Sequence, residues 1–161
     1  ALSKAGLPVV WTTPIGFRVT QAYRPLKDKR LVTVVGRVQV QDPDPVKGFD
    51  TRKQATSAAP NIIHSLDAAM LQVCARELFD RGVYGSWIHD SYGALPNHIP
   101  LLHDILRETA FAIFKEDVLA DLNQQFAELA ESAETPVKLP APPTLGSFDV
   151  EQVLRAPYFF S

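Results

Sequence analysis

The chain has 161 residues, 46% of them hydrophobic and 21% charged, with a formal net charge of −2. This composition is typical of a globular protein and excludes an intrinsically disordered one, and the length corresponds to one domain or to one lobe of a larger domain. The lack of a cationic excess counts against an autonomous nucleic-acid-binding module, which usually carries surplus lysine and arginine.

The first 53 residues are predicted to be rich in β-structure. Residues 8–19 are apolar, with turn residues at Pro14 and Gly16, which indicates a short strand pair. Residues 29–41 alternate between apolar and polar side chains around Gly36, which predicts a β-hairpin with one polar face. The X-Pro pairs of residues 42–48 predict a loop.

Residues 54–134 carry three helical patterns and a second hairpin. The first helix is expected to begin near Pro60 with Ser57 as its N-cap, because proline is favoured in the first helical turn. Its apolar stripe runs to Cys74, which we expect to be a buried structural thiol. Amphipathic helices are also predicted over residues 101–114 and 118–129.

Residues 135–161 are predicted to form a surface strap and a tail. Residues 135–143 are rich in proline and therefore extended, and a short helix is expected over residues 148–154 before the aromatic ending of residues 158–160. The fold class predicted for the whole chain is α+β, with β-hairpins and several packed helices.

The second hairpin contains the most informative motif of the chain. Two short apolar runs flank a polar pair, bounded by Gly82 and Pro96, in the sequence Trp87-Ile88-His89-Asp90-Ser91-Tyr92-Gly93. A hairpin with His89-Asp90 at its turn holds a carboxylate in a fixed place, where it can bind Mg²⁺, an ion that takes one or two protein carboxylates together with water and phosphate oxygens. The alternative is an ordinary surface turn, since aspartate is a favoured turn residue.

Five stretches in register resemble the C-terminal part of single-subunit DNA-directed RNA polymerases of the phage and mitochondrial type. The resemblance implies a palm-and-fingers portion of a right-hand polymerase and covers nearly the whole chain. The stretches are Pro8 to Phe17, Lys53-Gln54 with Ala59 to Asp67, the His89-Asp90 hairpin, Arg107-Glu108-Thr109, and Val118 to Leu122.

The resemblance implies template-dependent nucleotidyl transfer by two Mg²⁺ ions. Asp90 matches one metal-binding catalytic acid, whereas the second acid and the helix that binds the nucleoside triphosphate lie upstream of this chain, so the fragment alone is expected to be inactive. His89 matches a histidine beside the primer end, with a structural hydrogen bond as the alternative role. His64 matches a histidine near the nucleotide sugar and the minor groove, although a capping or packing role is the alternative. Asn61, Ser65 and Asp67 are interpreted as residues that orient the helix.

The hairpin of residues 29–41 corresponds to the promoter-reading hairpin of the phage enzymes. Arginine and glutamine are the side chains that read guanine and adenine edges in the major groove. The exposed face is expected to include Arg37, and a register shift of one residue would exchange the two faces. A solvated hairpin edge is the alternative. By resemblance, the base-facing positions are Arg30, Val32, Gln39 and Gln41.

Other basic residues and the aromatic chain end are further candidates for contact with nucleic acid or the active site. The candidates for phosphate contact, which supplies affinity but no sequence choice, are Lys27, Lys29, Arg52 and Lys53. Phe160 lies in an aromatic ending similar to one that, in the family, folds back toward the active site.

The implied partners are the DNA template and promoter, nascent RNA, nucleoside triphosphates and the missing N-terminal part of the same polymerase. No run of apolar residues approaches the length of a membrane span, so no membrane partner is expected. The expected compartment is the cytoplasm of a bacterium that hosts a phage or prophage, with the mitochondrial matrix as the alternative.

Two other functions remain open from the sequence. A metal-dependent phosphohydrolase would use His64, His89 and Asp90, but such enzymes carry the His-Asp pair on a helix, and the glycines at positions 85 and 93 disfavour one. A non-catalytic DNA-binding module would need only the hairpin of residues 29–41.

Overall fold

A computed structural model describes residues 1–44, 46–88 and 90–159. Within them the chain forms helices and three separate antiparallel hairpins, which confirms the α+β class. None of these helices has both the length and the apolar character needed to cross a bilayer. The strands are β1 Val9–Thr12, β2 Arg18–Gln21, β3 Leu26–Thr33, β4 Gly36–Pro43, β5 Gly85–Ile88 and β6 Ser91–Ala94. The helices are η1 Leu2–Ala5, α1 Thr51–Asp80, η2 Pro96–His98, α2 Ile99–Phe114, α3 Val118–Glu131 and η3 Val150–Arg155.

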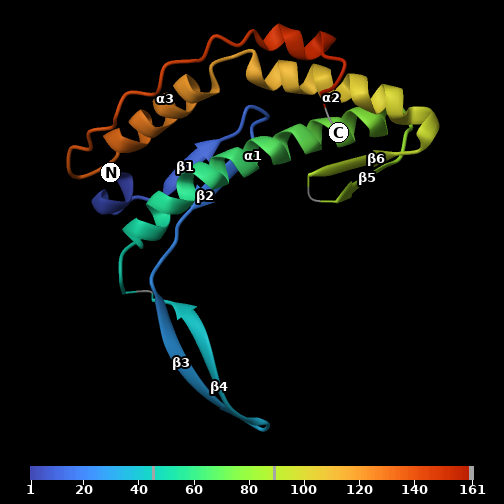
Figure 1. The fold of residues 1–161 in the computed structure, drawn as a ribbon. Helices are drawn as coiled ribbons and strands as arrows, with labels where there is room; N and C mark the ends of the chain where they lie inside the picture. The colour runs from blue at the N-terminus through green and yellow to red at the C-terminus, as the bar shows by residue number, and fades with distance from the viewer. Residues whose placement is uncertain (45, 89, 160–161) are drawn as a thin grey trace.

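Helix α1 runs through the middle of the molecule, and the other elements are arranged around it (Figure 1). The Asp50 side chain caps it by accepting a hydrogen bond from the Lys53 backbone N–H at 2.9 Å. The predicted start near Pro60, with Ser57 as the cap, is therefore wrong, because Pro60 lies inside the helix. A proline there removes one backbone hydrogen bond, so other contacts must hold the first turns of α1.

A buried pair of glutamines supplies such contacts. Gln21 of β2 donates from Nε2 to both the backbone carbonyl and the side-chain Oε1 of Gln54, at 2.8 and 2.6 Å, and Gln54 donates back to the Gln21 carbonyl at 2.8 Å. Gln54 is 1% exposed. Because buried amides that lose a partner cost about 1–3 kcal/mol, this exchange ties the early turns of α1 to β2.

The β1–β2 hairpin is held between α1 and α3. The Trp11 indole N–H donates to Ser65 Oγ on α1 at 2.9 Å, and the Trp11 side chain is almost fully buried. On the other side, the backbone of Thr12 exchanges two hydrogen bonds with the Gln125 side chain of α3, at 2.7 and 3.1 Å. These bonds fix the position of the hairpin between the two helices.

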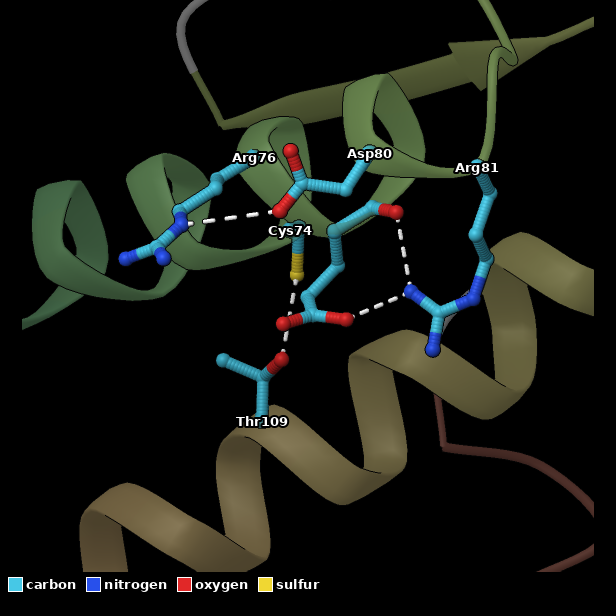
Figure 2. Close-up of polar contacts among 6 residues, drawn as sticks. Cys74, Arg76, Asp80, Arg81 and Thr109 are labelled. Atoms are coloured by element: carbon cyan, nitrogen blue, oxygen red, sulfur yellow. Dashed lines mark hydrogen bonds and ion pairs between the residues drawn. The ribbon is translucent and has the colours of Figure 1, made fainter.

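The hydrophobic core lies where α1 packs against α2. Cys74 of α1 is fully buried, as predicted, and its thiol donates to Thr109 Oγ1 of α2 at 3.6 Å (Figure 2). Burial raises the pKa of this thiol. Ion pairs such as Arg76–Asp80, with 3.6 Å between Nε and Oδ2, lie on the exposed side of α1 and add little. The core residues are Ala69, Met70, Cys74, Leu78, Leu102, Ile105, Leu106, Ala110 and Ile113.

The C-terminal segment folds back over α2, where Arg107 holds it. The guanidinium donates from Nε and Nη2 to the Ala156 carbonyl at 3.2 and 2.8 Å. Val153 and Phe159 pack against the core from this side. The helix predicted over residues 148–154 is found as the 3₁₀ helix η3, and residues 136–146 contain no helix or strand.

Leu78→Ala should lower the free energy of unfolding by about 2–5 kcal/mol, because it opens a cavity at the α1–α2 interface where Leu78 is fully buried. The matched control is the next residue, Phe79, which is 74% exposed. Phe79→Ala should change stability by no more than about 0.5 kcal/mol. Urea unfolding followed by circular dichroism measures both, and similar losses for the two variants would contradict this placement of the core.

Candidate functional site

The β5–β6 hairpin presents Asp90 at its turn. Ile88 pairs with Ser91, Asp90 lies in the connection between the two strands, and the Asp90 side chain is exposed. His89, the other predicted residue of this turn, lies outside the described residues. A carboxylate in this position is available to a ligand from solvent.

An aromatic pair and two glycines fix this hairpin against the core. The rings of the cross-strand partners Trp87 and Tyr92 meet edge to face, with centroids 5.7 Å apart. A Cβ on Gly85 would lie 2.5 Å from the Trp87 ring, and one on Gly93 would lie 2.6 Å from Ser86 Oγ. Since Trp87 and Tyr92 both pack against the α1–α2 core, the position of the Asp90 turn depends on that core.

A groove of about 510 Å³ lies between α1 and this hairpin. It brings together His64 and Asp90, two residues that the sequence assigned to one site. Its α1 wall follows helical spacing, so side chains from more than two turns share one face. The lining residues are His64, Asp67, Ala68, Leu71, Gln72, Asp90 and Tyr92.

Asp67 faces the groove, although the neighbouring polar residues Asn61 and Ser65 face the first hairpin. Asn61 donates from Nδ2 to Gln21 Oε1 at 2.8 Å, and Ser65 accepts from Trp11, so both residues attach α1 to the first hairpin. Asp67 instead lines the groove, is exposed, and has no hydrogen bond or ion pair to any residue of the described chain. Gln72, which the sequence did not single out, lines it too; the spacing 64, 67, 68, 71, 72 is the signal that could have identified this wall.

The groove is electrostatically negative. Burial of the hydroxyl, with repulsion from Cys74, Asp67 and Asp90 as further causes, raises the pKa of Tyr92 to about 12. Tyr92 therefore stays protonated at neutral pH and adds no charge of its own. Among the described residues that line the groove, the acidic side chains that face a ligand are Asp67 and Asp90.

The side chains of the groove supply only part of the ligands that a hard cation such as Mg²⁺ needs. Across residues 1–44, 46–88 and 90–159, no three His, Cys, Asp or Glu side chains are grouped so that they could hold a metal ion. Mg²⁺ needs only one or two protein carboxylates when water and phosphate oxygens supply the remaining ligands. Asp90 can therefore provide one such ligand, with the others coming from outside this chain.

The β3–β4 hairpin carries the second set of candidate residues. Arg30 pairs with Gln39, and Asp28 pairs with Gln41. Because directly paired residues point to the same side of a sheet, Arg30, Gln39 and Gln41 share one face with Val32. Arg37, which pairs with Val32, belongs to this face too. The side-chain amide of Gln41 donates to Asp28 Oδ1 at 3.3 Å.

This hairpin projects away from the other elements, from the end of α1 where the helix begins (Figure 1). Every residue of β3 is exposed. At the base, Asp50 N–H donates to the Tyr23 carbonyl at 2.9 Å, and the Lys53 ammonium lies 4.8 Å from the centroid of the Tyr23 ring. Lys27 and Lys29 lie on the opposite face to Arg30. The hairpin face and the Asp90 groove are thus two separate surfaces, one beside the start of α1 and the other along residues 64–72 in its middle.

Comparison with known proteins gives consistent results over nearly the whole chain. The family model for DNA-dependent RNA polymerase matches residues 1–135. The chain is 33% identical over 162 residues to the DNA-directed RNA polymerase of Enterobacteria phage T3, a match that covers 95% of this chain and 18% of the phage protein. It is 30% identical over 172 residues to the mitochondrial DNA-directed RNA polymerase of Homo sapiens, with 99% of this chain and 14% of the human protein covered.

The match to a tobacco relative covers nearly all of both proteins. The DNA-directed RNA polymerase 1A of Nicotiana tabacum is 31% identical over 155 residues, which is 96% of this chain and 96% of the tobacco protein. The mitochondrial DNA-directed RNA polymerase of Schizosaccharomyces pombe is 27% identical, and the match covers 15% of its length. The chain therefore spans less than a fifth of the human, fission yeast and phage relatives.

The pKa of Tyr92 generates a prediction about stability at alkaline pH. The folded protein holds the Tyr92 proton up to about pH 12, whereas the unfolded chain loses it near pH 10. The stabilising contribution of protonated Tyr92 to the free energy of unfolding is therefore complete below about pH 10 and is lost as the pH rises toward 12. Tyr92→Phe lacks this titration, so its stability should fall less between about pH 9 and about pH 11.5. Urea midpoints at both pH values test this, and equal falls in variant and parent would contradict it.

Proposed function

Because this chain belongs to the DNA-dependent RNA polymerase family, we propose that it forms the C-terminal part of the catalytic region of an enzyme that copies DNA into RNA. The observation that carries this proposal is the exposed carboxylate of Asp90 at a hairpin turn, facing a groove that it shares with His64 of α1. Residues assigned to the reaction from separate parts of the sequence thus lie at one surface. The chain would supply one side of an active site that upstream polypeptide completes.

Asp90 is the proposed metal-binding residue. Its turn position leaves the carboxylate oxygens exposed, and the Trp87–Tyr92 pair packs the hairpin against the core. Mg²⁺ bound here would activate the attacking hydroxyl and stabilise the departing pyrophosphate. A second acid from outside this chain would complete the pair of metal sites.

His64 is the proposed contact to the nucleic acid beside Asp90. It is exposed in the groove, and a neutral imidazole can either donate or accept a hydrogen bond. A sugar hydroxyl or a minor-groove edge is a suitable partner for such a group. We extend the same proposal to His89, which by the family resemblance matches a histidine beside the primer end.

The exposed face of the β3–β4 hairpin is the proposed promoter-reading surface. Arg30 and Gln39 lie side by side across the strands, where they can address neighbouring base edges, with Val32 and Gln41 on the same face. A two-stranded ribbon fits the major groove. Lys27 and Lys29, on the other face, would contact phosphates.

The phosphohydrolase alternative has no support in the structure. Residues 85–88 and 91–94 form strands β5 and β6, and Asp90 lies in a turn, whereas that chemistry requires the His-Asp pair on a helix. The non-catalytic DNA-binding module is disfavoured by the family match, which extends beyond the hairpin to residue 135.

The proposed partners of the complete enzyme are template and promoter DNA, nascent RNA, nucleoside triphosphates and the upstream polypeptide. We propose the cytoplasm of a phage or prophage host as the place of action. The mitochondrial matrix is the second candidate, since relatives of both origins match this chain.

Asp90→Asn in the complete polymerase should abolish RNA synthesis and leave promoter binding nearly intact, because the variant loses a charged metal ligand but no contact to DNA. The loss should exceed the roughly 10–100-fold cost of removing an outer-sphere metal partner. Asp80→Asn, at the exposed end of α1, is the matched control and should retain full activity. Primer extension and gel-shift assays measure the two properties, and RNA synthesis by Asp90→Asn would refute the ligand role.

Arg30→Ala should change which promoter is preferred, by about 1–3 kcal/mol for the base pair that Arg30 reads. Lys29→Ala is the control on the opposite face of the same strand. It should weaken binding to all sequences equally and reduce the salt dependence of binding. Binding to a panel of promoter variants at two salt concentrations separates these effects. If Arg30→Ala kept the parental promoter preference, the hairpin face would not read bases.

A further inference from the structure

The α1 wall of the Asp90 groove has an unusual charge for a nucleic-acid site. Among the described residues that line the groove, Asp67 of this wall and Asp90 of the facing turn are carboxylates, and none is lysine or arginine. Phosphate groups are bound through cationic side chains and backbone N–H groups, which this wall does not present. Metal ions can offset the charge of Asp90, but Asp67 lies on the helix and faces the same space. A nucleic acid in this groove must therefore present an edge other than its phosphates.

The ribose edge of an RNA-containing duplex meets this requirement. RNA in an A-form helix displays its 2′-hydroxyl groups along a wide, shallow minor groove. An ionised carboxylate can only accept hydrogen bonds, and a 2′-hydroxyl can donate one. Asp67 is exposed in the groove and is not engaged by any other described residue, so its oxygens remain available.

The position of Asp67 selects the strand it would contact. Asp67 follows His64 by three residues on the same helix face, about 4.5 Å along the axis. By the proposed function, upstream polypeptide holds the incoming triphosphate, whereas a strand that is already paired can present its sugars to this wall. The contact therefore falls on the product strand rather than on the incoming nucleotide.

We propose that Asp67 accepts a hydrogen bond from a 2′-hydroxyl of the growing RNA strand and so makes the α1 wall of the groove selective for an RNA product. This inference rests on the proposed function. A DNA strand in the same place offers no donor to the carboxylate, which then loses water without gaining a partner. Sites built to bind a hydroxyl reject analogues that lack it for this reason.

The test compares RNA-primed and DNA-primed templates of the same sequence, bound to the complete polymerase in magnesium-free buffer with EDTA. Fluorescence anisotropy gives Kd for each, and the parent should bind the RNA-primed template more tightly. Asp67→Leu, which removes the acceptor at similar size, should reduce this preference about tenfold or more, as expected for a lost hydrogen bond to a charged group. Asp67→Asn keeps one acceptor oxygen and should retain part of the preference. The same substitution at an exposed acid of α2, Glu108→Leu, should leave it unchanged.

An unchanged preference in Asp67→Leu overturns the inference. So does a variant whose only defect is a higher Mg²⁺ concentration for half-maximal synthesis, since Asp67 would then serve the metal. Asp90→Asn, measured in parallel, separates this failure from failure of the proposed function. If Asp90→Asn loses synthesis while Asp67→Leu keeps the preference, only the role of Asp67 is wrong. RNA synthesis by Asp90→Asn would instead overturn the proposed function itself.

Discussion

The packing of α1 against α2 is the interaction on which the Asp90 groove depends. Leu78 and Cys74 are fully buried at this interface, and Trp87 and Tyr92 pack against the same cluster. The α1 wall of the groove and the hairpin that carries Asp90 are therefore both attached to one apolar core. Because close-packed interiors allow little independent motion, this arrangement fixes the distance between the two walls.

The two candidate surfaces carry opposite charges. The hairpin from Leu26 to Pro43 carries four basic and two acidic side chains, whereas the part of the groove lining that the structure describes carries two carboxylates and no lysine or arginine. The net charge of −2 averages over these surfaces. The net charge therefore does not decide whether either surface binds nucleic acid, because binding depends on where charges lie rather than on their sum.

Local patterns predicted the hairpins and helices well but misplaced one important boundary. Alternation over residues 29–41 gave the β3–β4 hairpin, and its register places Arg30, Val32, Gln39 and Gln41 on one face. Pro60 misled the prediction for α1, because the helix begins nine residues earlier at Thr51. The glutamine exchange between β2 and α1 stabilises those early turns, and no local signal reveals a hydrogen bond between residues 33 positions apart. Tertiary contacts therefore overrode the local preference of proline.

The sequence by itself determined which side chains share a helix or strand face, since the spacing of residues is fixed by the geometry of a regular element. His64, Asp67 and Gln72 therefore had to lie on one stripe of α1. Only the tertiary structure decided that this stripe faces Asp90 rather than the core or a strand. Which elements meet depends on how their apolar faces pack. That packing involves residues from α2 and from the chain end, and no local sequence pattern connects these residues to the His89-Asp90 motif.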